Sequence, residues 1–184
     1  MISLMRQTVA QPYNYILALD PSGSFYEGKG TTGYCLFDVQ KNEFIICGSI
    51  FAKNYNCMEE YWDAIVKLII DTCRTYDKTY LVCEDYLLYS TKLQDQINSR
   101  METPKLIGVI QHMCWKLQIP YYMQTAAEVK NRWADHILEH KGYIRMFRNR
   151  YIPTSGDITT YTHHTLDAIR HAAHFVTFKL KTTR

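Results

Sequence analysis

Two apolar stretches of the sequence each end in a carboxylate. YNYILALD ends at Asp20 and YLVCE ends at Glu84, and both patterns predict buried β-strands. If the two strands are parallel neighbours, their carboxyl ends lie about 5 Å apart and the two carboxylates converge. Active sites of α/β sheets favour this edge. Acids at strand ends also cap helices and form turns, so this pair alone leaves catalysis and a structural role both open.

A histidine-rich stretch near the C-terminus, THHTLDAIRHAAHF, predicts a helix that adds further side chains to the same site. It belongs to a helix that we expect at about 161–179. At about 100° per residue, His164, Asp167 and His171 share one helix face, and His174 lies at its edge. We expect His164 and Asp167 to join the strand-end acids, His171 to support a ligand, and the remaining histidines to take no part.

Asp20, Glu84, His164 and Asp167 together would form a metal site with catalytic function. Three carboxylates and one imidazole suit Mg²⁺ or Mn²⁺ better than zinc, because hard cations prefer oxygen ligands. Asp20 could bridge two ions, and two ions about 3.5–4 Å apart activate a water and stabilise the leaving oxygen of a phosphodiester. Such a site would suit two-metal hydrolysis of a phosphodiester.

Zinc is the competing interpretation. His136 and His140 have the i,i+4 spacing of a chelating pair, but the glutamate of an H-E-x-x-H motif is missing. The six cysteines contain no C-x-x-C pair, which favours buried free thiols in a reducing compartment over a disulfide framework or a zinc knuckle. We therefore favour the hard-metal site.

Basic residues gather in one segment. Residues 130–150 hold six basic and two acidic residues, a net charge of +4, whereas the whole chain carries +3. Aromatic residues are interleaved with them, as in segments that bind a phosphate backbone beside unstacked bases, but a solvated helix face remains an equal alternative. The candidate DNA contacts here are Lys130, Arg132, Lys141, Arg145, Arg148 and Arg150.

The elements that must position these residues follow the order β-β-β-α-β-α-β-α-α. Three strands joined by short turns predict an antiparallel meander, and two later strands that alternate with helices extend it in parallel. We expect an α/β fold with a five-stranded mixed sheet flanked by helices. The predicted helix starts are Asn56 with Glu59, Thr103 followed by Pro104, and the capping box of Thr125 and Glu128.

The 184 residues suffice for one domain, and we expect a single domain over 1–184 with a loose arm at 1–13. No signal peptide and no run long enough to span a membrane is visible, so we expect no membrane association and a cytoplasmic location. The helix from Leu106 to Leu117 is apolar nearly all round, which predicts burial on two sides, by the sheet and by a second subunit.

Four stretches of the chain together resemble the motifs of a known family. ILALDPSG…GTTGYCLFD resembles the first motif of the RuvC-type Holliday junction resolvases, within the RNase H-like nuclease superfamily. YLVCEDY resembles their second motif, PYYMQTAAEVK the stretch that leads to a DNA-contacting lysine, and HHTLDAIRHA the final motif. The motifs occur in family order and span residues 15 to 176.

The resemblance implies a homodimeric, metal-dependent endonuclease that nicks both strands of a four-way DNA junction. By motif, Asp20, Glu84, His164 and Asp167 correspond to the metal ligands, and Lys130 to a DNA contact. The apolar helix from Leu106 to Leu117 occupies the place of the family's dimer interface.

The sequence departs from the family pattern in three places. SGSFYEGKG lengthens the loop after Asp20, and NRWADHILEHKGYIRMFRNRY replaces the glycine-rich basic loop. Leu87 stands where an aromatic wedge is expected, with Tyr86 and Tyr89 beside it as candidate DNA contacts. The last two changes affect junction recognition and resemble viral, bacteriophage members of the group.

Other functions stay open. A non-catalytic junction-binding protein would keep the fold, and another RNase H-like nuclease would act on flaps, forks or RNA–DNA hybrids. A sugar-kinase-like or actin-like ATPase shares the strand pattern that ends in Asp20, but it needs two such halves, and this chain is too short for them.

Overall fold

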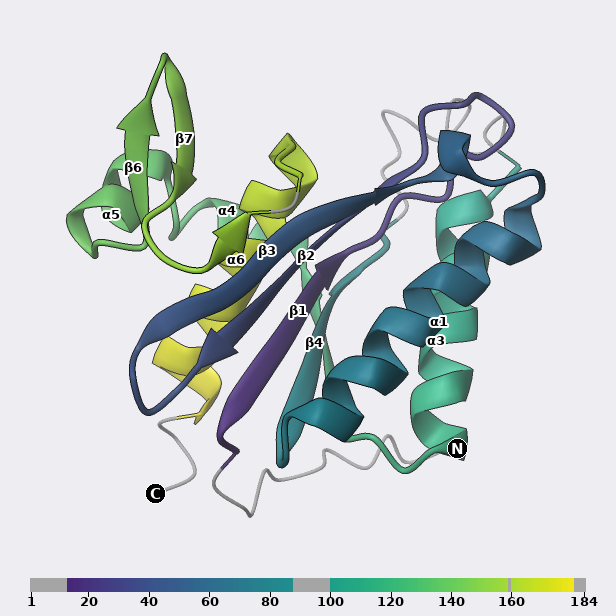
Figure 1. The fold of residues 1–184 in the computed structure, drawn as a ribbon, viewed down its shortest axis with the longest axis horizontal. Coiled ribbons are helices and arrows are strands. Elements are labelled where there is room, and N and C mark those ends of the chain that lie inside the picture. The colour runs from purple at the N-terminus through teal and green to yellow at the C-terminus, as the bar shows by residue number, and fades with distance from the viewer. Residues whose placement is uncertain (1–12, 88–99, 159, 181–184) are drawn as a thin grey trace.

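The computed structural model describes residues 13–87, 100–158 and 160–180, and its centre is a mixed β-sheet with helices on both faces (Figure 1). The strands follow the spatial order β5-β4-β1-β2-β3-β8. They are β1 (Tyr15–Asp20), β2 (Thr31–Asp38), β3 (Glu43–Phe51), β4 (Thr79–Asp85), β5 (Tyr121–Thr125) and β8 (Asp157–Ile158).

The topology confirms the predicted mixed sheet. β1, β2 and β3 form an antiparallel meander, while β4 pairs in parallel with β1 and β5 in parallel with β4. Two features were not predicted. The short β8 adds a sixth strand, parallel to β3, and a separate hairpin forms from β6 (Ile144–Phe147) and β7 (Arg150–Pro153).

Helices cover the sheet in two layers (Figure 1). One layer holds α1 and α3, which pack against each other, and the other holds α6, which packs on β1, β2 and β4. The helical elements are η1 (Ala52–Asn54), α1 (Met58–Thr75), α3 (Glu102–Lys116), α4 (Ala126–Lys130), α5 (Asp135–His140), and α6 (His163–His174) with its π-helical continuation η3 (Phe175–Lys179).

The central strand β1 shows why its sequence is a continuous apolar run. Side chains alternate across a sheet, so Ile16 and Ala18 enter the core beneath α6, while Leu17 and Leu19 enter the core beneath α1 and α3. A strand covered on both faces needs apolar residues at every position. Burial on both sides leaves only the end of β1 for a polar group, and Asp20 stands there.

The predicted helix starts were correct in one case of three. Thr125 and Glu128 form the expected capping box at α4. α1 instead begins after Cys57, and Asn56 bonds Glu60 rather than capping the helix. α3 begins after Met101, and the Thr103 hydroxyl accepts a hydrogen bond from an N–H of the loop after β1 instead of capping its own helix.

That loop, residues 21–30, lies against the start of α3. The Gly23 N–H donates to Thr103 Oγ1 at 2.9 Å, and the Phe25 N–H donates to the carboxylate of Glu102, which is buried. A Cβ on Gly23 would lie 2.3 Å from the Thr103 nitrogen, so only glycine allows this approach. The insertion after Asp20 is therefore packed onto the helix layer.

α3 buries one face and exposes the other. Leu106, Ile107 and Ile110 are buried, whereas Trp115 is 67% and Leu117 44% exposed. Burial on the sheet side agrees with the predicted packing, and the second subunit stays a prediction.

Some predictions fall outside the described residues. The arm predicted at 1–13 lies there except for Tyr13, whose ring packs edge-on to Tyr80 with centroids 4.6 Å apart. Tyr89 also lies outside them. Among the described residues, no helix has the length and apolar character to cross a membrane.

Candidate active site

Asp20 and Glu84 stand side by side at the carboxyl edge of the sheet. In the parallel register of β1 and β4, Leu19 pairs with Cys83, so the two acids are the next residues on each strand. Asp20 is only 6% exposed. Burial raises the pKa of Asp20 to about 6, and the negative charges of Glu84 and Asp167 add to the rise, against a hydrogen bond with His164. The site therefore holds concentrated negative charge.

His164, in the first turn of α6, reaches the acid at the end of β1. Its Nδ1 lies 2.6 Å from Oδ2 of Asp20. Burial lowers the pKa of His164, but the hydrogen bond and the negative charge of Asp20 outweigh it, so the pKa is raised. The preceding His163 is exposed, and its ring lies against that of His164 with centroids 4.0 Å apart.

Asp167 lies one turn further along α6 and is held by two cations. Its Oδ2 is 3.3 Å from Nζ of Lys130, and its Oδ1 accepts from Arg170. Burial lowers the pKa of Lys130, yet attraction to Asp167, Glu84 and Asp20 raises it overall. Lys130 therefore pairs with Asp167 and also feels the negative charges of Glu84 and Asp20.

Glu84 is held from the same helix by His171. His171 is 1% exposed, and its Nε2 lies 2.9 Å from Oε2 of Glu84. Its Nδ1 lies 2.9 Å from Oε1 of Gln124, which pairs with Glu84 across β4 and β5. The buried Nε2 of Gln124 has no partner among the described residues. Turning this amide over lets Nε2 donate to Nδ1, and a neutral His171 then donates from its Nε2 to Glu84.

Two features clamp the start of α6 to the sheet. Gly33, the partner of Asp20 across β1 and β2, lies directly under the helix, and a Cβ there would be 2.0 Å from the carbonyl carbon of His164. On β3, the Ser49 hydroxyl lies 2.7 Å from that of Thr162 and 2.8 Å from that of Thr165. The close approach of the helix backbone to Gly33 and the hydroxyl bonds to Ser49 together hold the start of α6 where His164 can contact Asp20.

The predicted residues thus separate into two groups. The structure places Asp20, Glu84, His164 and Asp167 near the carboxyl edge of the sheet, and His171 contacts Glu84; their role as metal ligands stays a prediction. His174 is buried beside Phe178, with ring centroids 5.0 Å apart, and forms no described bond to these acids.

The predicted DNA contacts within the described residues come from several elements. Lys130 lies among the carboxylates, and Tyr86 directly follows β4. The guanidinium of Arg132 lies 4.9 Å from the centre of the Phe178 ring. Lys141 follows α5. The other three, Arg145, Arg148 and Arg150, belong to the hairpin of β6 and β7.

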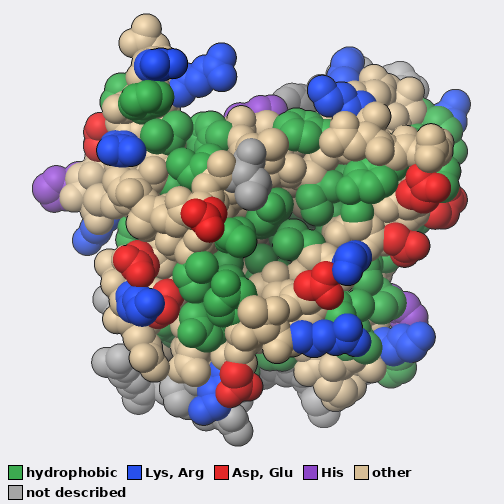
Figure 2. All heavy atoms as spheres, in the orientation of Figure 1, with side chains coloured by type: hydrophobic (Ala, Val, Ile, Leu, Met, Phe, Trp, Pro, Cys, Tyr) green, Lys and Arg blue, Asp and Glu red, His purple; other side chains and the backbone are tan. Residues whose placement is uncertain are grey.

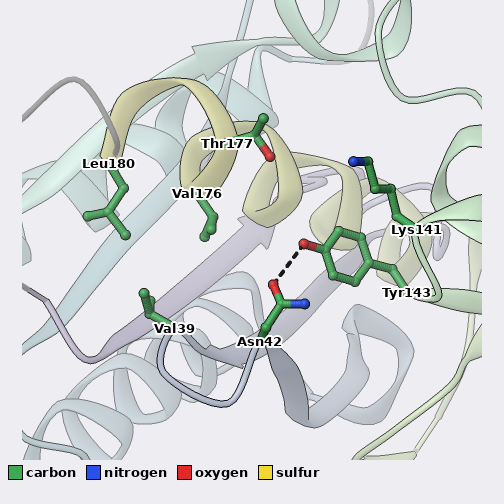
Figure 3. A pocket seen from close by; sticks show the side chains of 7 residues that line it. All are labelled: Val39, Asn42, Lys141, Tyr143, Val176, Thr177 and Leu180. Atoms are coloured by element: carbon green, nitrogen blue, oxygen red, sulfur yellow. Dashed lines mark hydrogen bonds between the residues drawn. The ribbon is translucent and has the colours of Figure 1, made fainter.

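A hollow of about 330 Å³ lies away from the acids (Figure 3). The Tyr143 hydroxyl donates to Oδ1 of Asn42 across it, at 3.1 Å. Its lining contains none of the four predicted ligands and consists of Val39, Asn42, Lys141, Tyr143, Val176, Thr177 and Leu180.

The donor set suits a hard divalent cation, although the side chains are not yet arranged around one. Three carboxylates and an imidazole lie at this edge, where burial first, and the negative charges of Glu84 and Asp167 second, raise the pKa of Asp20. Among the described residues, no three His, Cys, Asp or Glu side chains already converge as a ligand group. Lys130, Arg170 and His171 hold the carboxylates instead. His136 and His140 are exposed on α5, and no described bond joins either of them to the acids.

Sequence reasoning missed three residues that shape the site. Gly33 and Gln124 become significant only through the strand pairing that places them beside Asp20 and Glu84. Arg170 was not among the predicted site residues, but it bonds Asp167, Asp135 and the carbonyl of Trp133. Its i,i+3 spacing from Asp167 was the available signal.

The chain is similar to known proteins in its structure. No protein-family model and no curated protein sequence matches the chain. The structure is similar to Thermus thermophilus RuvC in complex with a Holliday junction substrate, with a TM-score of 0.62 and 12% identity over 93% of this chain and 98% of that one. A second Thermus thermophilus RuvC structure matches with a TM-score of 0.57 and 11% identity over 92% and 97%. The chain therefore has the RNase H-like fold of the RuvC Holliday junction resolvases.

Proposed function

We propose that this protein is a metal-dependent endonuclease that resolves four-way DNA junctions by paired nicks. The observation that carries the proposal is the gathering of Asp20, Glu84, His164 and Asp167 at the carboxyl edge of a RuvC-like sheet. A cluster of buried acids at this edge is costly to fold, and phosphodiester hydrolysis is a function that would retain it.

In this proposal Asp20, Glu84, Asp167 and His164 hold Mg²⁺, or Mn²⁺ in its place, as two ions. The ions would lower the pKa of a bound water and neutralise charge on the phosphate as the 3′-oxygen leaves, which yields 5′-phosphate and 3′-hydroxyl ends.

The protein's own groups have distinct tasks. His164 orients the Asp20 carboxylate through the bond to Nδ1, and His171 does the same for Glu84. The Lys130 side chain is 53% exposed while its ammonium pairs with Asp167, so it can turn from Asp167 towards a phosphate oxygen of DNA. Its raised pKa keeps it charged for that contact.

The proposal includes two binding partners, a second copy of the chain and DNA. The exposed side of α3, with Trp115 and Leu117, would join two copies of the chain into a homodimer, as paired nicking requires. DNA would contact Lys130, Arg132, Lys141 and the hairpin arginines, with Tyr86 and Tyr89 near the branch point.

The test is a synthetic four-way junction, labelled on each strand in turn and incubated with Mg²⁺. We expect paired nicks by the wild-type protein and no cleavage by Asp20→Asn or Glu84→Gln. His136→Ala, an exposed histidine on α5, is the matched control and should cleave normally. Nicking retained by either acid variant would reject the site.

One observation favours a second function, a non-catalytic junction-binding protein. In the described structure the carboxylates are engaged by Lys130, Arg170 and His171. Junction binding without cleavage in Mg²⁺ or Mn²⁺ would support it. Rates on flaps, forks and RNA–DNA hybrids in the same assay decide whether four-way junctions are the preferred substrate.

A further inference from the structure

The hairpin of β6 and β7 projects from the body of the protein (Figure 1). Its strands are joined by the two-residue turn Arg148–Asn149, whose φ angles are 45° and 62°. Glycine is favoured at such positions because side chains disfavour the left-handed region. The turn geometry itself does not explain why position 148 is an arginine. Arg148 does, however, place a guanidinium at the tip of the hairpin.

One face of the hairpin is used for folding. Side chains alternate along each strand, so the pairs Ile144–Pro153 and Met146–Tyr151 share a face. Ile144 and Pro153 are buried at its base, and the Tyr151 hydroxyl lies 3.5 Å from Oε2 of Glu139 on α5. This face is turned towards α5.

The other face carries an aromatic ring among cations. The pair Phe147–Arg150 shares this face with Arg145 and its partner Ile152. Phe147 is 50% exposed, and the guanidinium of Arg148 lies 5.3 Å from the centre of its ring. This face of the hairpin therefore presents a half-exposed aromatic ring beside one guanidinium, with Arg145 and Arg150 on the same face of the two strands.

The positive charge of this surface favours an anionic partner. The sequence contains no acidic residue between Glu139 and Asp157. None of the described carboxylates forms an ion pair with Arg145, Arg148 or Arg150. In Figure 2, Lys and Arg side chains stand out at the upper left, where Figure 1 shows the hairpin.

The hairpin is also fixed relative to the candidate active site. Arg170 of α6 bonds Asp167 and, through its other nitrogen, Asp135 at the start of α5. α5 in turn meets the hairpin through Glu139 and Tyr151. A molecule held by the hairpin is therefore positioned with respect to the acidic edge.

We propose that Phe147 stacks on an unstacked base at the branch point of DNA, while Arg145, Arg148 and Arg150 hold the phosphates on either side. The proposal rests on the proposed function for its substrate class, branched DNA. Base stacking on aromatic rings beside a basic groove is a general mode of binding to unpaired nucleotides. Insertion into a lipid surface would use Met146 and Phe147 together, but the register places them on opposite faces.

The test uses a four-way junction that carries the fluorescent base 2-aminopurine at the branch point, without divalent metal so that no cleavage occurs. Phe147→Ala should bind the junction roughly 5- to 150-fold more weakly and lose the fluorescence change that wild type produces. Phe147→Trp should restore both. Met146→Ala, equally exposed on the opposite face, is the matched control and should behave as wild type.

The outcomes separate this proposal from the proposed function. If wild type cleaves junctions in Mg²⁺ but Phe147→Ala binds and fluoresces like wild type, the stacking proposal alone is wrong. If wild type binds with the Phe147-dependent signal but never cleaves, stacking stands and the nuclease assignment falls. Phe147-dependent flotation with phosphatidylserine vesicles, without any effect on DNA binding, would assign the hairpin to membranes and overturn the proposal.

Discussion

Nδ1 of His164 lies 2.6 Å from Oδ2 of Asp20, although the two residues are 144 positions apart in the sequence. The contact joins the end of the central strand β1 to the first turn of α6, the last α-helix. Asp20 is buried there together with the charges of Glu84 and Asp167. These buried negative charges lower the free energy of unfolding, and the size of this effect can be measured.

The first prediction concerns stability and pH. Burial raises the pKa of Asp20 from 3.8 to about 6, so the folded state binds this proton more tightly than the unfolded chain does. Its stabilising effect is complete below pH 3.8 and is lost as the pH rises through 6. Without metal, Asp20→Asn should therefore be more stable than wild type at pH 8, by up to about 3 kcal/mol.

Thermal unfolding of both proteins between pH 4 and 8 checks this. The advantage of the variant should shrink towards pH 4, where Asp20 is protonated in the folded state and partly protonated in the unfolded chain. The pKa of His164 is also raised, so its contribution falls with rising pH in the same direction. Mg²⁺ should stabilise wild type at pH 8 and leave Asp20→Asn largely unchanged; equal stabilisation of both would count against Asp20 as a ligand.

The second prediction concerns the glycine under α6. A Cβ at position 33 would lie 2.0 Å from the carbonyl carbon of His164, and backbone cannot rotate away as a side chain can. Gly33→Ala should displace the start of α6, lower the free energy of unfolding by about 1–3 kcal/mol and abolish junction cleavage. Urea unfolding and the cleavage assay measure the two effects.

Gly108 provides the matched control for that substitution. It lies inside α3, and a Cβ there would meet nothing within 4 Å. Gly108→Ala should stabilise the protein by roughly 0.5–1 kcal/mol, because alanine loses less backbone entropy in a helix. A Gly33→Ala variant that cleaved like Gly108→Ala would show that the helix start does not need this close approach.

The position of Gly33 also shows how far the sequence alone could lead. Buried strands that end in acids were sufficient to predict that β1 and β4 are parallel neighbours with Asp20 and Glu84 at their ends, and helical spacing placed His164 and Asp167 on one face of α6. Such patterns are local and periodic. Gly33 and Gln124 carry no periodic signal, because their importance comes from cross-strand register.

The hairpin was missed for a different reason. Its strands contain four residues each, and the turn uses Arg148 and Asn149 instead of the glycine-containing pairs that mark two-residue hairpins. Basic and aromatic residues mixed over 130–150 predicted its chemistry but not its shape. The helix starts predicted at Asn56 and Thr103 failed because neither side chain accepts from an N–H of its own helix: the Asn56 amide donates to the carboxylate of Glu60, and the Thr103 hydroxyl accepts from Gly23.

The third prediction concerns the support of Glu84. His171 lies 2.9 Å from Glu84, and removal of a group that orients a metal ligand typically weakens metal binding by 10- to 100-fold. His171→Ala should show this loss in calorimetric titration with Mn²⁺, and His171→Gln, which keeps a donor, should recover part of it. His174→Gln, on the same helix but without a described bond to the acids, should bind as wild type. Wild-type affinity in His171→Ala would mean that Glu84 is positioned without it.

The fourth prediction concerns salt. Each phosphate contact that is lost on a duplex arm lowers the slope of log K against log salt by about 0.9. Arg145→Gln, Arg148→Gln and Arg150→Gln should each reduce the slope by about this amount when junction binding is measured by anisotropy at several NaCl concentrations. Lys67→Gln, an exposed cation on α1 that pairs with Asp71, serves as the control. An unchanged slope in all three arginine variants would remove the hairpin from the DNA interface.

The last prediction concerns the exposed side of α3. Trp115 is 67% exposed and its ring lies near that of His112, with centroids 5.9 Å apart. Buried tryptophans are frequent anchors of interfaces, and their loss often costs about 2–4 kcal/mol, so Trp115→Glu should weaken the proposed dimer by roughly 30-fold or more. Sedimentation equilibrium measures this, with the neighbouring exposed Lys116→Glu as the control for added negative charge. The monomeric variant should leave junctions nicked on one strand, whereas a wild-type protein that sediments as a monomer would contradict the dimer from the start.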